Sequence, residues 1–251
     1  MVYPPGQGKS GQQLMHLWRQ YLEQYAEQEG NVEEQIVVAS YHAAEVLGVL
    51  CITLDREGKL RTLIDERIGH FREGSRRAEA FNDHLVNATF AIYNHLNTIC
   101  RQFSGGNAAA GELLQQVEKQ AASQTLNSRG AESSAAALRA AFPLLSMMTL
   151  IVDYGSSITS AIRQVEQRFA AGSAHAESPW EQLLNALYRL VEMTQLLVVI
   201  SDNDLRSQVD QIASRFQEED HPAEVRLKMR NGFCRLFELT HLLTTHLDEI
   251  L

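Results

Sequence analysis

Cysteine, proline and lysine are scarce in this sequence, and each shortage argues against certain classes of protein. The chain of 251 residues holds three cysteines and five prolines. Cys51, Cys100 and Cys234 lie far apart among apolar residues, a pattern that fits neither a disulfide framework nor a metal knuckle. We therefore expect three buried free thiols and a cytoplasmic protein. The few prolines and the lack of runs of β-branched residues favour helix over strand.

Positive charge is also in short supply. The chain has 22 Lys and Arg against 31 Asp and Glu, a net charge of −9, and only 4 of the cations are Lys. A general phosphate-binding surface needs the opposite sign of charge, so nucleic acid is an unlikely main partner. One local basic patch is the exception, formed by Arg226, Lys228, Arg230 and Arg235.

Long apolar runs and a signal peptide are missing as well. Residues 1–10 contain prolines and glycines but no apolar core, so we expect a flexible leader there. The longest apolar stretches, 141–152 and 196–200, fall short of the roughly 20 residues that cross a bilayer. The sequence therefore predicts no membrane span.

Apolar residues that recur at helical spacing dominate the rest of the chain, and we predict an all-α bundle of seven to nine helices. Residues 51–64 leave two alternatives open. Gly58 could close a short β-hairpin, but the apolar spacing favours a helix-turn-helix. The clearest helix start is Ser178-Pro179-Trp180-Glu181, which has a capping residue, a first-turn proline and an acid in its preferred place. Helices are expected over about 11–29, 31–52 with a cap formed by Asn31 and Glu34, 75–103, 133–170 with a kink or new start at Pro143, 179–201, 204–218 and 222–250.

Composition changes in the middle of the chain. Residues 104–137 are rich in Ala, Ser and Gly, with one short helix near Leu114, and are predicted to be a linker. The linker would separate an N-terminal bundle, 11–103, from a C-terminal bundle, 138–251, and the two could pack as one domain. A weak similarity between 93–99 and 244–250 is too short to indicate a duplication.

Two motifs suggest bound ligands. Gly6-Gln7-Gly8-Lys9-Ser10 resembles the end of a P-loop, but Tyr3 replaces the required glycine and no strand can precede it, so we expect no nucleotide site. Glu238 and His241 have the spacing used by di-iron carboxylate bundles. No second Glu-x-x-His occurs, and so no metal or other cofactor is expected; Glu238 and His241 are the alternative metal ligands.

The segment from Arg235 to His241 resembles the Arg and His active-site motif of HEPN ribonucleases. The resemblance implies that Arg235 and His241 would converge on a scissile phosphate. Comparable spacings occur at Arg77 and His84, Arg168 and His175, and Arg215 and His221, so the pattern does not select a site. Ribonuclease activity is therefore kept as an alternative.

No arrangement of a nucleophile with its base is visible, which favours a protein that is not an enzyme. We predict a non-catalytic adaptor, scaffold or regulatory subunit that binds a protein partner or a second copy of itself. Aromatic and large apolar side chains at helical spacing are common interface anchors. The candidates are Trp18, Tyr21, Tyr25, Trp180, Leu184, Leu187 and Tyr188.

Overall fold

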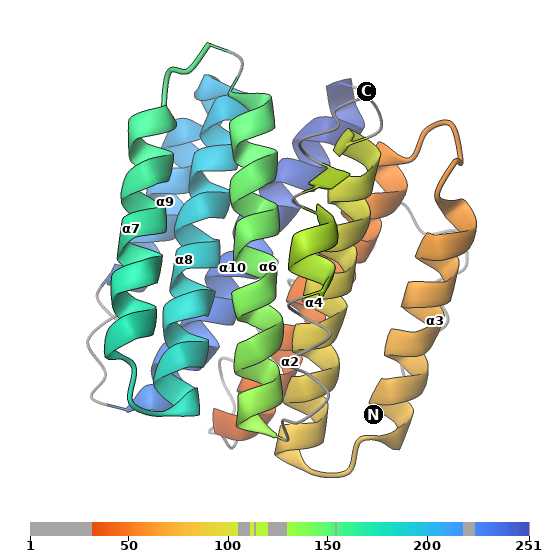
Figure 1. The fold of residues 1–251 in the computed structure, drawn as a ribbon, viewed down its shortest axis with the longest axis vertical. Coiled ribbons are helices and arrows are strands. Elements are labelled where there is room, and N and C mark those ends of the chain that lie inside the picture. The colour runs from red at the N-terminus through yellow and green to blue at the C-terminus, as the bar shows by residue number, and fades with distance from the viewer. Residues whose placement is uncertain are drawn as a thin grey trace.

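The chain folds into helices throughout the part that the structure describes. This computed structural model describes residues 32–104, 111–112, 114–119, 130–153, 155–217 and 224–250, and it has no strand among them (Figure 1). The predicted all-α class is therefore confirmed. The predicted leader and first helix, with the P-loop-like segment and Trp18, Tyr21 and Tyr25, lie outside the described residues. The named helices are α2 (Val32–Leu54), α3 (Arg61–Arg77), α4 (Phe81–Ser104), α6 (Ala131–Val152), α7 (Thr159–His175), α8 (Pro179–Ser201), the 3-10 helix η1 (Asn203–Leu205), α9 (Arg206–Gln217) and α10 (Val225–Ile250).

Residues 51–64 form a helix-turn-helix, so the alternative of a β-hairpin is wrong. α2 continues to Leu54, and the carboxylate of Asp55 accepts the Leu60 N–H at 3.1 and 3.2 Å. Gly58 has a φ of 67°, in the left-handed region that glycine adopts without strain. The turn satisfies its own amides and reverses the chain before α3.

Two predicted helix boundaries are wrong. Ser75 does not start a helix, because α3 continues to Arg77 and α4 begins at Phe81. No new helix starts at Pro143, which lies inside α6. The predicted helix over 133–170 is instead divided after Val152, and α7 begins at Thr159. Proline removes one helical hydrogen bond, and α6 compensates through extensive packing between α4 and α8.

The start of α8 matches its prediction. The Ser178 hydroxyl accepts the Glu181 N–H at 3.2 Å, and the Glu181 carboxylate accepts the Ser178 N–H at 3.1 Å. This reciprocal cap satisfies two amides that the first turn of a helix leaves open. The boundary follows from local residues alone.

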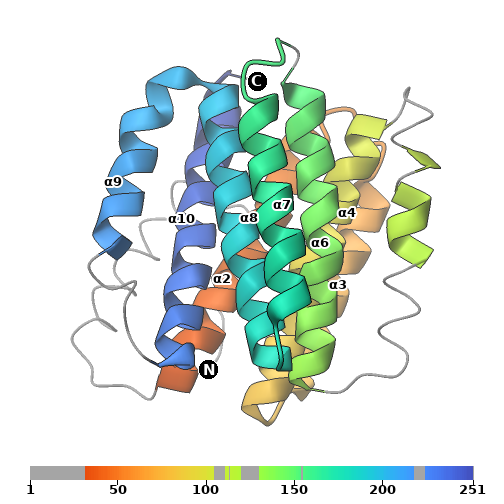
Figure 2. The ribbon, with the colours of Figure 1, turned by 60° about the vertical axis from the view of Figure 1, so that its left-hand side comes forward.

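The long helices α2, α4, α6, α8 and α10 close into a ring, each packed against the two beside it in that order. Both predicted bundles contribute to this ring. Of the other described helices, α3 packs outside α4, α7 outside α8, and α9 outside α10. The colours in Figures 1 and 2 show that the inner helices all run in one direction and that α3, α7 and α9 run in the other.

Apolar side chains from all the inner helices fill the axis of the ring. A cavity of about 10 Å³ remains, which is room for about one water molecule. Helical spacing alone predicted such apolar faces, but the ring decides which of them meet. Side chains that line the cavity include Leu47, Leu96, Leu145, Leu197, Leu236 and Leu243.

The chain holds two copies of one three-helix unit. α3 and α7 begin 98 residues apart (159 minus 61), as do α4 and α8 (179 minus 81). When residues 71–88 are aligned with residues 169–186 at this spacing, eight positions are identical. In the first segment they are Phe71, Gly74, Ser75, Ala78, Glu79, Leu85, Asn87 and Ala88. The first copy comprises α2, α3 and α4, and the second comprises α6, α7 and α8.

Equivalent residues make equivalent contacts in the two copies. Asn87 donates to the carbonyl of Phe71 at 3.0 Å, and Asn185 donates to the carbonyl of Phe169 at 3.0 Å. In both copies the amide packs against a glycine of the outer helix: a Cβ on Gly74 would lie 2.1 Å from Asn87 Oδ1, and one on Gly172 would lie 2.2 Å from Asn185 Oδ1. These close approaches require glycine and show that the units share one design.

The spacing continues into α10. Leu47 of α2, Leu145 of α6 and Leu243 of α10 are successive positions 98 residues apart, and all three line the central cavity. α10 therefore takes the place that the first helix of a third copy would have. It closes the ring against α2.

The expectation that no segment could span a membrane is wrong. α2, α6 and α8 have windows with mean hydropathy 1.7, 1.8 and 1.5, and each is long and apolar enough to cross a bilayer. Between half and two thirds of each window is buried inside the protein. The prediction failed because it counted only unbroken apolar runs. Polar residues and a few charged ones, such as Glu45 of α2, Arg139 of α6 and Arg189 of α8, interrupt these helices but leave their mean hydropathy high.

Candidate functional site

Arg235 and His241, the alternative catalytic pair, have different neighbours in the structure. Both lie on the continuous helix α10, and six residues correspond to about 240° around the helix axis. The Arg235 guanidinium lies 5.9 Å from the ring centre of Tyr188 on α8, and Arg235 is buried. His241 instead contacts the ring of Phe237, which in turn contacts His42 of α2.

The alternative metal ligands lie on the same helix. Glu238 and His241 keep the predicted spacing on α10. Over the described ranges, no group of three or more His, Cys, Asp and Glu side chains is placed to hold a metal ion. His84 accepts or donates a hydrogen bond with the Tyr41 hydroxyl at 2.7 Å, and so it is engaged in packing α2 against α4.

The predicted basic patch is used partly for internal contacts. Arg226 forms an ion pair with Glu33 of α2 at 2.9 Å, and Arg230 donates to Gln35 at 3.1 Å. The Lys228 carbonyl accepts the Tyr188 hydroxyl at 3.2 Å. Two of these cations therefore tie α10 to α2.

The interface candidates on α8 divide by burial. Leu187 is fully buried and packs against Gly232, so it belongs to the core. Trp180, Leu184 and Tyr188 are half-buried. The Trp180 ring stacks on Phe81 with 6.3 Å between centres, which joins the starts of α8 and α4.

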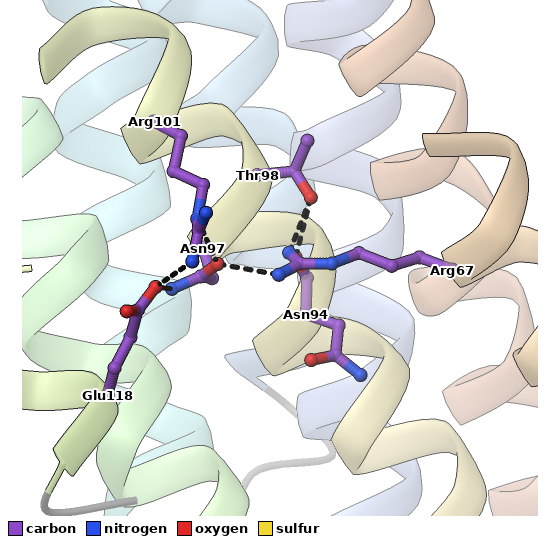
Figure 3. Close-up of polar contacts among 6 residues, drawn as sticks. All are labelled: Arg67, Asn94, Asn97, Thr98, Arg101 and Glu118. Atoms are coloured by element: carbon purple, nitrogen blue, oxygen red, sulfur yellow. Dashed lines mark hydrogen bonds and ion pairs between the residues drawn. The ribbon is translucent and has the colours of Figure 1, made fainter. Parts of the chain in front are cut away.

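A polar cluster that sequence reasoning missed lies on α3, α4 and the helical stretch 114–119. Figure 3 shows its centre, the Asn97 side chain of α4. The Asn97 oxygen accepts from Arg67 Nη2 at 2.8 Å and from Arg101 Nε at 3.1 Å, and its Nδ2 donates to Glu118 at 2.8 Å. Arg101 and Glu118 also form an ion pair.

Arg67 reaches this cluster from α3. One nitrogen of its guanidinium donates to the Asn94 carbonyl and to the Thr98 hydroxyl. Burial, and secondarily the charge of Arg101, lowers the pKa of Arg67. This half-buried cation is stable because its donors face fixed acceptors. We call Arg67, Asn97, Thr98, Arg101 and Glu118 the polar clamp, since they hold α3 and residues 114–119 to α4.

His95 of α4 lies where α2 and α4 pack together, close to Gly48 and Cys51 of α2. Its side chain is 1% exposed, and its Nδ1 has no hydrogen-bond partner in the described structure. Burial, with Arg67 as a smaller cause, lowers the pKa of His95 to about 4. The neighbouring Cys51 thiol donates to the His95 carbonyl at 3.4 Å, and burial raises its pKa to about 12. Both groups are therefore uncharged at neutral pH, and Cys51 is a poor nucleophile.

Cys51, Cys100 and Cys234 form no disulfide in the described structure. Cys51 and Cys100 are buried, as predicted, whereas Cys234 is only half-buried, so the prediction that all three are buried is wrong for Cys234.

The second copy shows that the fold does not require the clamp. Arg67, Thr98 and Arg101 correspond to Val165, Leu196 and Val199, and His95 corresponds to Met193. There the outer helix is held by apolar contacts, including Phe169 stacked on Phe142 at 4.1 Å, and by polar contacts at other positions. Arg168 of α7 pairs with Glu192 of α8 at 2.9 Å, and Ser146 of α6 donates to Glu166 of α7 at 2.5 Å. An alignment of the sequence with itself at a spacing of 98 residues would have shown that these polar residues occur in one copy and apolar residues in the other. Its presence in one copy alone makes this the candidate functional site.

Comparison with known proteins identifies no relative, because no protein-family model, no curated protein and no solved structure matches the chain. The fold and site define the class only as a duplicated helical ring with a polar clamp in one copy.

Proposed function

We propose that this protein is a non-catalytic helical adaptor or scaffold that acts by binding another protein. The observation that carries the proposal is the difference between the two copies. Both hold an outer helix against the ring, the second with an ion pair between Arg168 and Glu192, but the first adds a larger polar clamp centred on the buried Asn97, which holds α3 to α4. Fixing a helix surface before binding lowers the entropy cost of association.

The surface that the clamp fixes is charged. The outward face of α3 carries Arg72, Glu73 and Arg76, all exposed, where α7 of the second copy has Ala170, Ala171 and Ala174. Charged surface of this kind guides association and partner choice more than it adds affinity. The first copy thus offers a specific surface that the second copy lacks.

The packed axis also supports a role for the outer surface. Leucines from the inner helices leave only about 10 Å³ of space at the centre of the ring. A partner would therefore be bound by the outer helices or by the ends of the ring. Trp180, Leu184 and Tyr188 stay predicted contacts for such a partner, and the cytoplasm stays the predicted compartment.

Affinity capture from the native extract, with and without chemical cross-linking, tests the proposal. We expect wild-type protein to retain one partner protein in stoichiometric amount. The double variant Arg72→Ala and Arg76→Ala gives α3 the residues of α7, and should reduce retention by about tenfold. A matched control, Arg163→Ala and Gln167→Ala on the exposed face of α7, should bind like wild type.

Circular dichroism should show unchanged helix content in both double variants, because the substituted side chains are exposed. Recovery of no protein by the wild type, even after cross-linking, would show that the adaptor proposal is wrong.

A further inference from the structure

The outer helices of the ring are placed by one rule. α3, α7 and α9 each pack most extensively on the inner helix that follows them in the chain, and each also contacts the inner helix that precedes them. Each outer helix therefore lies over a seam, the line along which two neighbouring inner helices touch. It runs in the opposite direction to the inner helices, as Figures 1 and 2 show.

The seam between α10 and α2 has no outer helix among the described elements, although these two inner helices are closely packed. The rule assigns to this seam the segment that precedes α2, residues 11–29, for which the sequence predicts a helix. Its apolar stripe would then face α2 and α10, as the stripes of the other outer helices face the ring.

The connection to α2 supports this placement. α3 and α7 are joined to the next inner helix by residues 78–80 and 176–178. Only Gly30 and Asn31 separate the predicted helix from Val32, where α2 begins. Two helices joined by so short a connection become antiparallel neighbours. Residues 11–29 would thus run beside α2 in the direction of the other outer helices.

Two stripes of side chains border the seam between α10 and α2. His42 of α2 and Phe237 of α10 meet there with 6.3 Å between ring centres, and Phe237 also contacts the ring of His241. Residues three and four apart on a helix share a face, so these contacts extend into stripes of buried and half-buried side chains. The stripes are Val38, His42, Glu45 and Val49 on α2 and Cys234, Phe237, His241 and Thr245 on α10.

The segment before α2 carries a stripe that matches in spacing. Leu14, Trp18, Tyr21 and Tyr25 are separated by four, three and four residues, as are the members of the α2 stripe. Trp18 and His42 would lie at the same level of an antiparallel pair, because each is 12 residues from Gly30 (30 minus 18 and 42 minus 30). Tryptophan and tyrosine combine a large apolar area with a polar tip, which suits a seam that holds aromatic rings and histidines.

We propose that residues 11–29 form the outer helix of the seam between α10 and α2, with Trp18 packed on His42 and Phe237. The inference goes beyond the adaptor role, which rests on α3. It assigns Trp18, Tyr21 and Tyr25 to the chain's own ring rather than to a partner.

Cys234 allows a direct test by crosslinking, since it belongs to the α10 stripe and is only half-buried. Cys234 lies one turn from Phe237, and Tyr21 lies one turn from Trp18 toward the same end of the ring, so the two should be neighbours. The full-length variant Tyr21→Cys is treated at low concentration with a short bismaleimide, and the linked peptides are identified by mass spectrometry. We expect a link between position 21 and Cys234 within one chain.

Glu23→Cys is the matched control for this experiment. Position 23 is two residues further along the predicted helix, which turns it by about 200° away from the stripe. It should give little or no link to Cys234. Cys51 and Cys100 are buried and should not react in the native protein.

Tryptophan fluorescence gives a second measurement that needs no new thiol. The chain has two tryptophans, so Trp180→Phe leaves Trp18 as the only emitter and keeps a ring that can stack on Phe81. Acrylamide should quench Trp18 several-fold less in the native full chain than in urea. His42→Ala in this background should increase the quenching, whereas the exposed His70→Gln should not, with helix content checked by circular dichroism.

Four results would overturn the inference. Equal crosslinking by Tyr21→Cys and Glu23→Cys would remove the predicted orientation, and native Trp18 quenched as fully as in urea would remove the contact. A link between two chains, seen as a dimer in sedimentation, would assign the stripe to a second copy. Loss of a captured partner on Trp18→Ser, with Trp18 open to acrylamide in the free chain, would assign it to that partner.

The two proposals fail separately. Loss of the predicted link would leave the binding surface of α3 untouched, and failure to capture a partner would leave the crosslinking and quenching results as they are.

Discussion

Acid should destabilise this protein through His95. The pKa of the ring is lowered from 6.5 to about 4, first by burial and second by Arg67. The unfolded chain therefore takes up the proton before the folded protein does as the pH falls. The free energy of unfolding is unaffected by His95 at high pH, decreases as the pH falls below about 6.5, and stops decreasing below about 4.

The magnitude follows from the difference in pKa. Each pH unit between the two pKa values costs about 1.4 kcal/mol, so the full loss is about 3 kcal/mol. Between about pH 7.5 and about pH 5 the expected loss is about 2 kcal/mol. This is a large share of the stability of an ordinary domain, which is about 5 to 15 kcal/mol.

Urea unfolding followed by far-ultraviolet circular dichroism measures this loss in wild type and in His95→Met. Methionine fits the position, because Met193 is fully buried at the equivalent place in the second copy. The variant should lose about 2 kcal/mol less than wild type between about pH 7.5 and about pH 5.

His70→Gln, at an exposed position on α3, is the matched control for the loss of a histidine. It should keep the wild-type pH dependence. If His95→Met loses as much stability in acid as wild type, the reasoning from burial is refuted.

Three further predictions use the same unfolding assay or simple labelling. Arg67→Met should destabilise the protein by about 2 kcal/mol and reduce the hydrogen-exchange protection of α3, because it leaves clamp acceptors unpaired; the exposed Arg72→Met should change neither. Gly74→Ala should lower the free energy of unfolding by about 2 kcal/mol, because the new methyl group displaces Asn87. Gly69→Ala on the same helix, with nothing within 4 Å of the new methyl group, should raise it by about 0.5 to 1 kcal/mol. A Gly74→Ala variant more stable than Gly69→Ala would contradict the packing of Asn87 on Gly74. The two fully buried thiols should resist alkylation by iodoacetamide until urea unfolds the chain, and rapid labelling of both in native protein would show that they are accessible.

Little of the candidate site could be predicted from the sequence. Arg67 and Asn97 are 30 residues apart, and Glu118 follows 21 residues later, on separate elements. No local spacing relates these residues, because only the packing of α3 and residues 114–119 on α4 brings them together. The motifs that the sequence does suggest, Arg235 with His241 and Glu238 with His241, are pairs of residues close together on one helix.

The sequence by itself determined those features that depend on neighbouring residues. Helical spacing of apolar residues established the all-α class, and Ser178 with Glu181 established the start of α8, because a helix and its cap form from contacts only three or four residues apart. Tertiary structure alone decided that Pro143 stays within α6, where packing on both sides outweighs a lost hydrogen bond. It also decided that the two copies close a ring with α10, since this outcome depends on contacts between segments about a hundred residues apart.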